Sequence, residues 1–277
     1  MQVFEYRGIL DLQKTLFCGQ CFHWRKVGPD TYCGVIGDHL YTAVQQPDKT
    51  VLFYFKDGCR EDIIDLFDLK RDYSVLCCRF GKNALLKEAV QAGEGLRLMH
   101  ITPWEALCSF ILSQNNNITR ITGLVQNLCR LYGKHIEGDF YAFPTSERLA
   151  ALTVEDLAPI KAGFRARYLI DAAKKVTSGQ VDLASLAAHR DPFVRKKLMQ
   201  IHGVGPKVAD CVLLFGFQRI RTVPMDVWMK RVLQAGFGGK WPRCSAGAEG
   251  IAQQFLFDFA RQNPNFFKKG DNSVVKK

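Results

Sequence analysis

The spacing of hydrophobic positions along the chain changes near residue 60. Between residues 17 and 55, short runs rich in β-branched and aromatic side chains alternate with turn residues, and residues 22–24, 32–36 and 51–55 are such runs. Short strands joined by tight turns are typical of an antiparallel sheet. From Glu61 onward the spacing becomes helical and stays so almost to the end. The pattern predicts an α+β protein with a sheet domain first and an all-helical domain second.

Helix-boundary signals refine this division. Thr102 can cap a helix, Pro103 suits the first helical position, and Glu105 completes a capping box. A second helical stripe ends at Gly133, and its members are Ile118, Ile121, Val125, Leu128 and Leu131. We therefore expect residues 1–98 to form the antiparallel sheet domain and residues 99–277 the helical domain. The chain closes on a basic tail that contains Lys268, Lys269, Lys276 and Lys277.

Length and composition exclude several classes of protein. At 277 residues the chain is long enough for about two domains with a substantial core. No apolar run approaches the roughly 18 residues of a membrane span, and the first residues lack a secretory signal pattern. The 10 cysteines are irregularly spaced, which fits a reducing compartment. We expect a monomer inside the cell, in a bacterial cytoplasm or nucleoid or in a nucleus, with no membrane partner.

The positive charge is unevenly distributed. The net charge is +11, yet residues 1–98 carry 13 basic and 13 acidic side chains, whereas the remaining 179 residues carry 25 basic and 14 acidic ones. An excess confined to one region is typical of a surface that binds a polyanion, nucleic acid before membrane. A basic surface that serves only solubility is the alternative.

The most informative segment runs from Leu198 to Asp210. Gly203 and Gly205 allow a sharp turn within a hairpin near residues 195–217, and Pro206 opens the second helix of that hairpin, whose N-terminal amides can hold a phosphate. The apolar stripe of this helix is Val204, Val208, Cys211, Val212 and Phe215. The segment resembles the helix-hairpin-helix element of DNA-repair proteins, and Gly203, Val204 and Gly205 are the expected DNA-binding residues.

Lys207 lies in the first turn of that helix, where the positive end of the helix dipole disfavours a cation by about 0.3 to 1 kcal/mol. Stability alone does not select lysine there, whereas covalent catalysis uses an amine nucleophile. Nineteen residues later comes Asp226, which fits either a helix N-cap or a catalytic partner. Together the two segments resemble the helix-hairpin-helix DNA glycosylases. The resemblance implies that Lys207 attacks the sugar and that Asp226 assists.

Further motifs narrow the resemblance to 8-oxoguanine DNA glycosylases. The segment from Phe17 to Trp24 resembles the S-G-Q-x-F-x-W motif of that family, in which the glycine at the Gly19 position offers its carbonyl to the lesion. That choice is chemically apt because 8-oxoguanine carries a proton on N7, which a carbonyl accepts, whereas guanine presents a lone pair there. An ordinary turn glycine is the alternative for Gly19.

An asparagine run, residues 115–117, also resembles the family. In that family, the residues at the Asn115, Arg120 and Arg165 positions bind the cytosine that has lost its partner. Amide and guanidinium groups suit this role because they donate hydrogen bonds to the acceptor atoms of cytosine. Phe164 stands where a tyrosine commonly wedges into the emptied duplex. A simple helix-end cluster is the alternative for the asparagines.

Near the C-terminus, Gln253 and Phe257 form an i, i+4 pair that is rotated away from a core face of Ile251, Phe255 and Phe259. They match the glutamine and phenylalanine of the family's base pocket. Cys211 matches the residue that stacks on the other side of the base, and a small core residue is its alternative. We therefore expect Gly19, Gln253, Phe257 and Cys211 to bind the base.

Cofactor patterns are weak in this sequence. Cys18 and Cys21 form a C-x-x-C without a second ligand pair at zinc-finger spacing, so they are interpreted as structural. The four-cysteine iron–sulfur motif of endonuclease III has no counterpart, because only Cys244 lies beyond Cys211. The resemblance implies a structural cation on the carbonyls of Met199, Ile201 and Val204, and no cofactor for catalysis.

Two departures from the family pattern concern phosphate contacts. His23 stands where many relatives have arginine, and Trp228 replaces a histidine that some relatives carry.

The resemblance implies a TATA-binding-protein-like sheet domain followed by a helix-hairpin-helix glycosylase domain. It further implies a bifunctional enzyme that extrudes 8-oxoguanine opposite cytosine from double-stranded DNA, excises it through a lysine Schiff base and nicks the strand by β-elimination. Two alternatives remain: a monofunctional glycosylase for alkylated bases, and a DNA-binding module without enzymatic activity.

Overall fold

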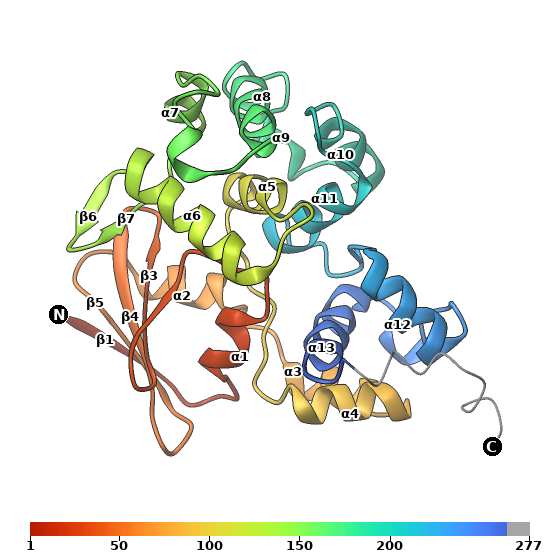
Figure 1. Ribbon diagram of the computed structural model, residues 1–277. Helices are drawn as coiled ribbons and strands as arrows, with labels where there is room; N and C mark the ends of the chain where they lie inside the picture. The colour runs from red at the N-terminus through yellow and green to blue at the C-terminus, as the bar shows by residue number, and fades with distance from the viewer. Residues whose placement is uncertain (265–277) are drawn as a thin grey trace.

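The computed structural model describes residues 1–264 and begins with an antiparallel sheet of five strands in the order β1-β5-β4-β3-β2 (Figure 1). The strands are β1 (Gln2–Tyr6), β2 (Arg25–Gly28), β3 (Thr31–Ile36), β4 (His39–Gln45) and β5 (Val51–Phe55). The predicted antiparallel sheet is therefore confirmed. The pattern missed β1, which pairs along its whole length with β5.

The predicted strand at residues 22–24 is wrong. Phe22 and Trp24 are buried, but they pack by their rings instead of joining the sheet ladder. Trp24 lies edge-on to Phe67 at 5.5 Å and fills the space above Gly34, where a Cβ would stand 2.3 Å from the indole. Gly34 therefore gives Trp24 its place against the sheet.

Helices make up most of the rest of the chain. They are α1 (Leu12–Phe17), α2 (Arg60–Leu66), α3 (Tyr73–Phe80), α4 (Ala84–Ala92), α5 (Pro103–Leu112), α6 (Ile118–Tyr132), α7 (Ser146–Ala150), η1 (Ala158–Ile160), α8 (Arg165–Thr177), α9 (Leu183–Leu186), α10 (Asp191–Leu198), α11 (Pro206–Cys211), η2 (Val212–Gly216), α12 (Val227–Phe237), η3 (Arg243–Ser245) and α13 (Glu249–Gln262). The sheet and the helices lie side by side, with α1 between the sheet and α13 (Figure 1). The α+β prediction is confirmed.

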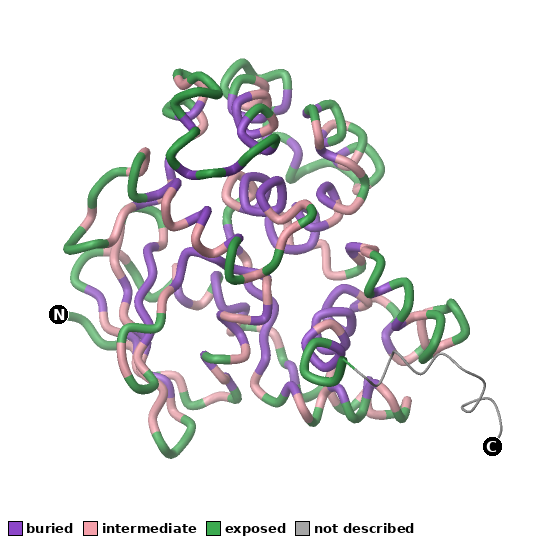
Figure 2. Tube along the Cα trace, viewed as in Figure 1, coloured by how far each residue is buried: buried purple, intermediate pink, exposed green. Residues whose placement is uncertain are grey.

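Helix α5 runs through the middle of the helical part, and Ala106 to Leu112 are all buried (Figure 2). It begins as predicted, because Thr102 accepts a hydrogen bond from the Glu105 N–H and Pro103 takes the first position. Helix α6 also ends at Gly133 as predicted. The reason differs: Gly133 is extended, and a Cβ there would stand 1.9 Å from the Ala142 carbonyl oxygen.

The short hairpin of β6 (His135–Glu137) and β7 (Phe140–Tyr141) was not predicted. It packs against β3 and β4, and Arg25 pairs with Asp139 at 2.8 Å across this contact. His23 is buried here, with Nε2 2.8 Å from the Tyr141 carbonyl. This contact holds the His23 side chain against the β6–β7 hairpin.

The segment that joins the two parts is fastened to the Gly19 loop by Gln20. The buried Gln20 amide donates to the carbonyls of Thr15 and Arg97 and accepts the N–H of Met99. The division at residues 98 and 99 stays a prediction. The predicted basic tail, Lys268 to Lys277, lies outside the described residues.

Candidate active site and nucleic-acid interface

One cavity of about 1110 Å³ collects residues from six parts of the chain. Of the predicted site residues, those that line it are Gly19, Asn115, Phe164, Gly205, Lys207, Asp226 and Phe257. Arg120, Arg165, Gly203, Val204, Cys211 and Gln253 do not line it, and neither do Met199 and Ile201. The cavity therefore joins the expected nucleophile to two of the four residues expected to bind the base, Gly19 and Phe257.

Lys207 follows Pro206 at the start of α11 and is half-buried. Its Nζ lies 3.5 Å from the Ser113 hydroxyl and 5.4 Å from the centre of the Phe110 ring. Ser113 donates to the Phe110 carbonyl at 2.8 Å, so its oxygen lone pairs are free to accept from the amine. Sequence reasoning missed Ser113, although it directly precedes the Gln114–Asn117 run.

Asp226 is both a helix N-cap and a residue of the cavity wall, so it fits both interpretations given above. It is the N-cap of α12, and its Oδ1 accepts the Met229 N–H at 2.7 Å. Within residues 1–264, Oδ2 makes no hydrogen bond or ion pair, and no ion pair joins Asp226 to Lys207. One carboxylate oxygen thus caps α12, and Asp226 also lines the cavity.

Gly19 lies opposite Ile118 and Phe257. Its φ is +91°, and a Cβ there would stand 2.7 Å from Ile118 Cδ1 and 3.5 Å from Phe257 Cε1. Both the backbone conformation and the missing side chain are therefore needed at this wall of the cavity.

Gln253 lies one turn before Phe257 on α13 and is 5% exposed. Its Oε1 is buried and has no hydrogen-bond partner among the described residues. A buried amide oxygen without a donor is costly for stability, so an incoming donor has a clear role there.

Cys211 is buried one turn after Lys207. Burial raises the pKa of its thiol to about 11, and the charge of Lys207 lowers it in part. The thiol is therefore neutral at pH 7.

Arg165 is buried, and its side chain supports the backbone of the asparagine loop. Its guanidinium donates to the carbonyls of Gln114 at 2.8 Å, Asn115 at 2.9 Å and Ala162 at 3.2 Å. Asn115 itself is exposed, with a φ of +48°. Most of the donors of Arg165 thus shape the loop and do not face an open site.

Arg120 and Phe164 are exposed near this loop. Burial lowers the pKa of Arg165, and the nearby charge of Arg120 lowers it further. The Arg120 guanidinium has no hydrogen bond or ion pair in the described part of the chain. Phe164 is 45% exposed at the cavity rim, and the Arg165 guanidinium lies 4.5 Å from its ring.

The hairpin between α10 and α11 turns at Gly203, whose φ is +80°. A Cβ on Gly203 would stand 2.3 Å from the Tyr168 ring, whereas one on Gly205 would meet nothing within 4 Å. The stripe of Val204, Val208, Cys211, Val212 and Phe215 is buried as predicted. The side of the hairpin at Gly205 is therefore open to a ligand.

Comparisons with known proteins identify the family to which this fold belongs. Residues 3–107 match the family described as 8-oxoguanine DNA glycosylase, N-terminal domain, and residues 108–245 match the HhH-GPD superfamily of base excision DNA repair proteins. The structure of MBOgg1 with a low-affinity DNA ligand is 36% identical and superposes with a TM-score of 0.87 over 95% of this chain and 96% of that one.

The chain belongs to the 8-oxoguanine DNA glycosylase family.

A second solved member is the Clostridium acetobutylicum 8-oxoguanine glycosylase/lyase with duplex DNA that carries cytosine opposite 8-oxoG. It is 30% identical, with a TM-score of 0.84 over 95% of this chain and 99% of that one. The N-glycosylase/DNA lyase of Saccharomyces cerevisiae is 40% identical over 161 residues. That alignment covers 52% of this chain and 42% of the yeast protein, so this chain spans less than half the length of that relative.

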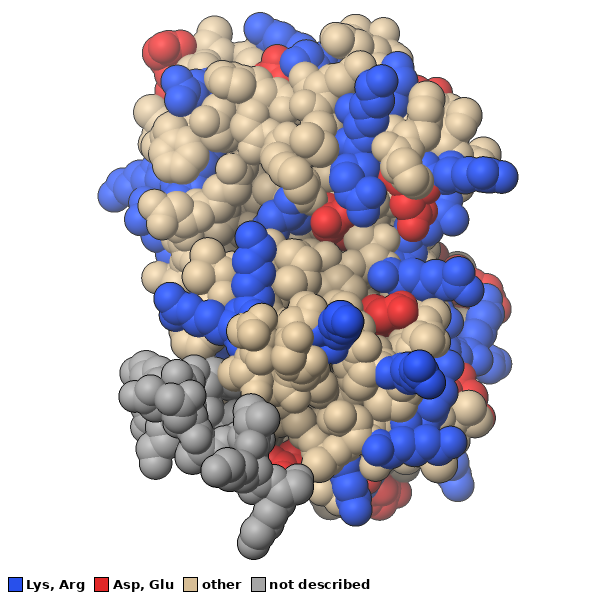
Figure 3. Space-filling view, turned by 90° about the vertical axis from the view of Figure 1, so that its right-hand side faces the viewer, with Lys and Arg blue, Asp and Glu red and all other residues tan. Residues whose placement is uncertain are grey.

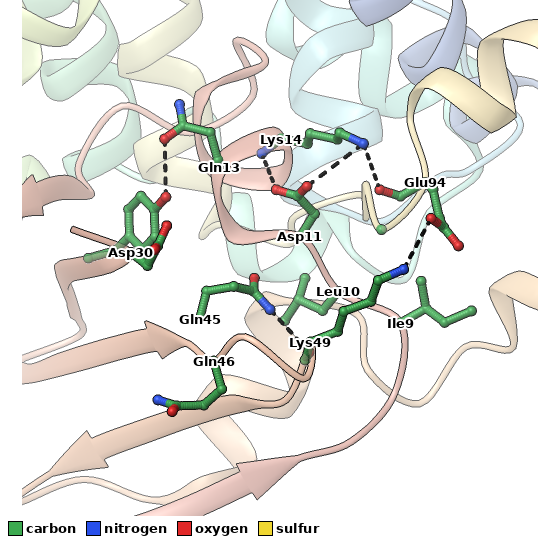
Figure 4. A pocket seen from close by; sticks show the side chains of 12 residues that line it. Ile9, Leu10, Asp11, Gln13, Lys14, Asp30, Gln45, Gln46, Lys49 and Glu94 are labelled. Carbon is green, nitrogen blue, oxygen red and sulfur yellow. Dashed lines mark hydrogen bonds and ion pairs between the residues drawn. The ribbon is translucent and has the colours of Figure 1, made fainter.

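A separate cavity of about 270 Å³ beside α1 has no free cation (Figure 4). Lys14 lies 3.7 Å from Asp11 and donates to the Glu94 carbonyl, and Lys49 pairs with the Glu94 carboxylate at 3.5 Å. These internal pairs explain its polar lining without a ligand.

Positive charge is most evident on another part of the surface. On the face of the molecule that carries α10 and α12, Lys and Arg side chains are widespread and acidic ones are few (Figure 3). Within residues 1–264 no cluster of three His, Cys, Asp or Glu side chains could hold a metal, and no helix is both long and apolar enough to cross a membrane. Cys18 and Cys21 are buried free thiols.

Proposed function

We propose that this protein is a bifunctional DNA glycosylase and AP lyase that excises 8-oxoguanine paired with cytosine in duplex DNA. The observation that carries the proposal is the meeting of Lys207, Asp226, Gly19 and Phe257 in one cavity. An amine nucleophile, a carboxylate and a base-sized pocket are the parts that this reaction requires.

Base recognition uses two residues of the cavity wall, Gly19 and Phe257, and two buried residues that lie one helical turn from the lining, Cys211 and Gln253. The Gly19 carbonyl accepts the N7 proton that guanine lacks, and Phe257 and Cys211 contact opposite faces of the ring. The orphaned Oε1 of Gln253 accepts a proton from the Watson–Crick edge of the base. Of these contacts, the one at Gly19 favours the damaged base over guanine, because only 8-oxoguanine carries a proton on N7.

Lys207 carries the covalent step. Its neutral amine forms a bond to C1′ while the C1′–N9 bond breaks, and the electron pair leaves with the base, which takes up a proton. Asp226 stabilises the positive charge that develops on the sugar. Opening of the sugar ring gives a Schiff base. Loss of a C2′ proton then breaks the C3′–O bond, and the phosphate leaves as the strand is nicked.

The opposite strand is held by the asparagine loop. Asn115 and Arg120 donate to the acceptors of the unpaired cytosine, and Phe164 fills the gap in the stack. Most of the N–H groups of Arg165 donate to loop carbonyls, and these bonds position Asn115 for the cytosine. The remaining N–H of Arg165 donates to the cytosine itself.

The hairpin holds the DNA backbone. The N–H groups of Gly203 and Gly205 face a phosphate, while the Val204 N–H donates to the Ile201 carbonyl and Val204 contributes through its place in the turn. The carbonyls of Met199, Ile201 and Val204 would hold a structural cation that bridges to it. Ile201 accepts the Val204 N–H at 3.0 Å and keeps its second lone pair, so it fits a ligand role. Catalysis needs no cofactor, and the enzyme acts as a monomer on the DNA inside the cell.

A borohydride trap tests the proposal. The protein is mixed with an 8-oxoguanine·cytosine duplex and sodium borohydride, which reduces a Schiff base to a stable adduct. A covalent complex that Lys207→Gln abolishes supports the lysine mechanism. Excision without an adduct would favour the monofunctional alternative, and binding without excision would favour a DNA-binding module.

A further inference from the structure

The hairpin turn, residues 199–205, contacts helix α8 through three side chains of that helix. The Asp171 carboxylate accepts the backbone N–H of His202 at 2.6 Å, and Lys175 donates to the Gln200 carbonyl at 2.7 Å. Tyr168 fills the space beneath Gly203, where a Cβ would stand 2.3 Å from its ring. All three contacts come from successive turns of one helix face.

Helix α8 begins next to Phe164, the residue proposed to wedge into the duplex. Phe164 and Arg165 stand at the N-terminal end of α8, and the Phe164 ring packs edge-on to Tyr168 at 5.6 Å. The contacts of α8 therefore fix the hairpin turn relative to the wedge and the asparagine loop. A duplex that meets all three at once gains from this fixed geometry.

A carboxylate beside the hairpin has an electrostatic cost. Asp171 accepts an N–H within the turn that is proposed to bind a phosphate, so its charge repels the ligand. Lys175 lies 2.8 Å from the same carboxylate oxygen, and the two side chains are only 21% and 29% exposed. Partial burial limits screening by salt, so the pair is held close to neutral.

We propose that Asp171 and Lys175 are positioning residues for DNA binding. Asp171 holds the hairpin turn on α8, and Lys175 cancels the charge of Asp171 so that a backbone phosphate can approach. This inference rests on the proposed function, because it assigns two further residues to the same DNA-binding hairpin.

Lys175→Met is the first test, and Lys174→Met is its matched control. Lys174 is the preceding residue on α8, and its ammonium has no partner among the described residues. Binding is measured with a duplex that contains a tetrahydrofuran abasic analogue opposite cytosine, at several salt concentrations. We expect Lys175→Met to weaken binding about tenfold and Lys174→Met about threefold or less.

Asp171→Asn separates charge from shape. The asparagine side chain keeps an oxygen for the His202 N–H but has no charge, so binding should stay within about twofold of the wild type or tighten. The double variant Asp171→Asn with Lys175→Met should recover to within about threefold of the wild type. If the pair only stabilised the fold, removing the second residue would not restore DNA binding.

The kinetics give an independent readout. At saturating protein, the single-turnover excision rate should change by less than about twofold in Lys175→Met, because the chemistry at Lys207 is untouched. Equal binding by the Lys175→Met and Lys174→Met variants, or no recovery in the double variant, would overturn the inference. Wild-type protein that fails to bind the duplex would instead refute the proposed function.

Discussion

Gly19 and Ile118 lie so close that the Cβ of an alanine at position 19 would stand 2.7 Å from Cδ1 of Ile118. Gly19 lies in the segment between α1 and β2 and Ile118 in the first turn of α6, and both line the cavity. The width of the base pocket therefore depends on the absence of a single side chain.

Gly19→Ala should lower the rate of 8-oxoguanine excision by at least about tenfold, because the methyl group displaces a wall of the pocket. Its positive φ should also cost about 1 kcal/mol of folding free energy. Gly37→Ala is the control, since Gly37 has a φ of +59° and nothing within 4 Å of a Cβ. The control should lose stability alone. Equal excision rates for both variants would contradict this assignment of Gly19.

Asp226→Asn should reduce single-turnover excision by about 100-fold or more while Tm stays nearly constant. Asparagine still caps α12 through the Met229 N–H, but it has no charge for the sugar cation. Asp226→Ala should lose the cap as well and cost about 1 kcal/mol. Asp182→Asn, at the N-cap of α9, should leave activity intact. An active Asp226→Asn enzyme would exclude the proposed carboxylate role.

Gln253→Leu should leave the free protein equally or more stable, by up to about 2 kcal/mol, because it removes a buried oxygen without a partner. The same variant should bind the 8-oxoguanine duplex more weakly. Gln254→Leu is the neighbouring control: it loses the 3.1 Å contact from Nε2 to the Cys18 sulfur and should be destabilised. Thermal melting with and without duplex measures both effects, and a destabilised Gln253→Leu would argue against a base-reading role.

The stability of the protein should fall as pH rises from about 4.5 to 7 on account of Glu105. Burial raises the pKa of Glu105 from 4.5 to about 7, so in this window the folded state keeps a proton that the unfolded state has lost. Above pH 7 the cost is fully present. Glu105→Gln should therefore raise the free energy of unfolding by about 2 kcal/mol at pH 8 and have little effect at pH 4. Denaturant titrations at the two pH values check this, and a gain independent of pH would show another cause.

Protonation of His23 should change the stability of the protein in the opposite direction, at lower pH. Burial lowers its pKa to about 4, so between about 4 and 6.5 the unfolded state binds the extra proton and stability rises with pH. His23→Gln should flatten this acid limb of the stability curve. Equal acid sensitivity of the variant and the wild type would place the loss elsewhere.

Local pattern predicted those elements whose signals lie within one turn of chain. Thr102 and Pro103 set the start of α5 through their own cap and dihedral angle, and the buried stripe from Val204 to Phe215 follows from its spacing. The pattern failed at Phe22 and Trp24, because their aromatic rings pack into the core without a ladder partner. The β6–β7 hairpin escaped notice because its strands are only 3 and 2 residues long.

Hydrophobic spacing and short motifs were enough to predict the sheet-then-helix order and the residue types of the site, because these signals lie in neighbouring residues. How the site residues are used depends on contacts between distant parts of the chain. The tertiary structure committed the Arg165 guanidinium to loop carbonyls, placed Ser113 beside Lys207 and joined Asp171 to the hairpin. Such contacts join residues that are 51, 94 and 31 positions apart. They depend on how whole helices pack, which no local periodicity encodes.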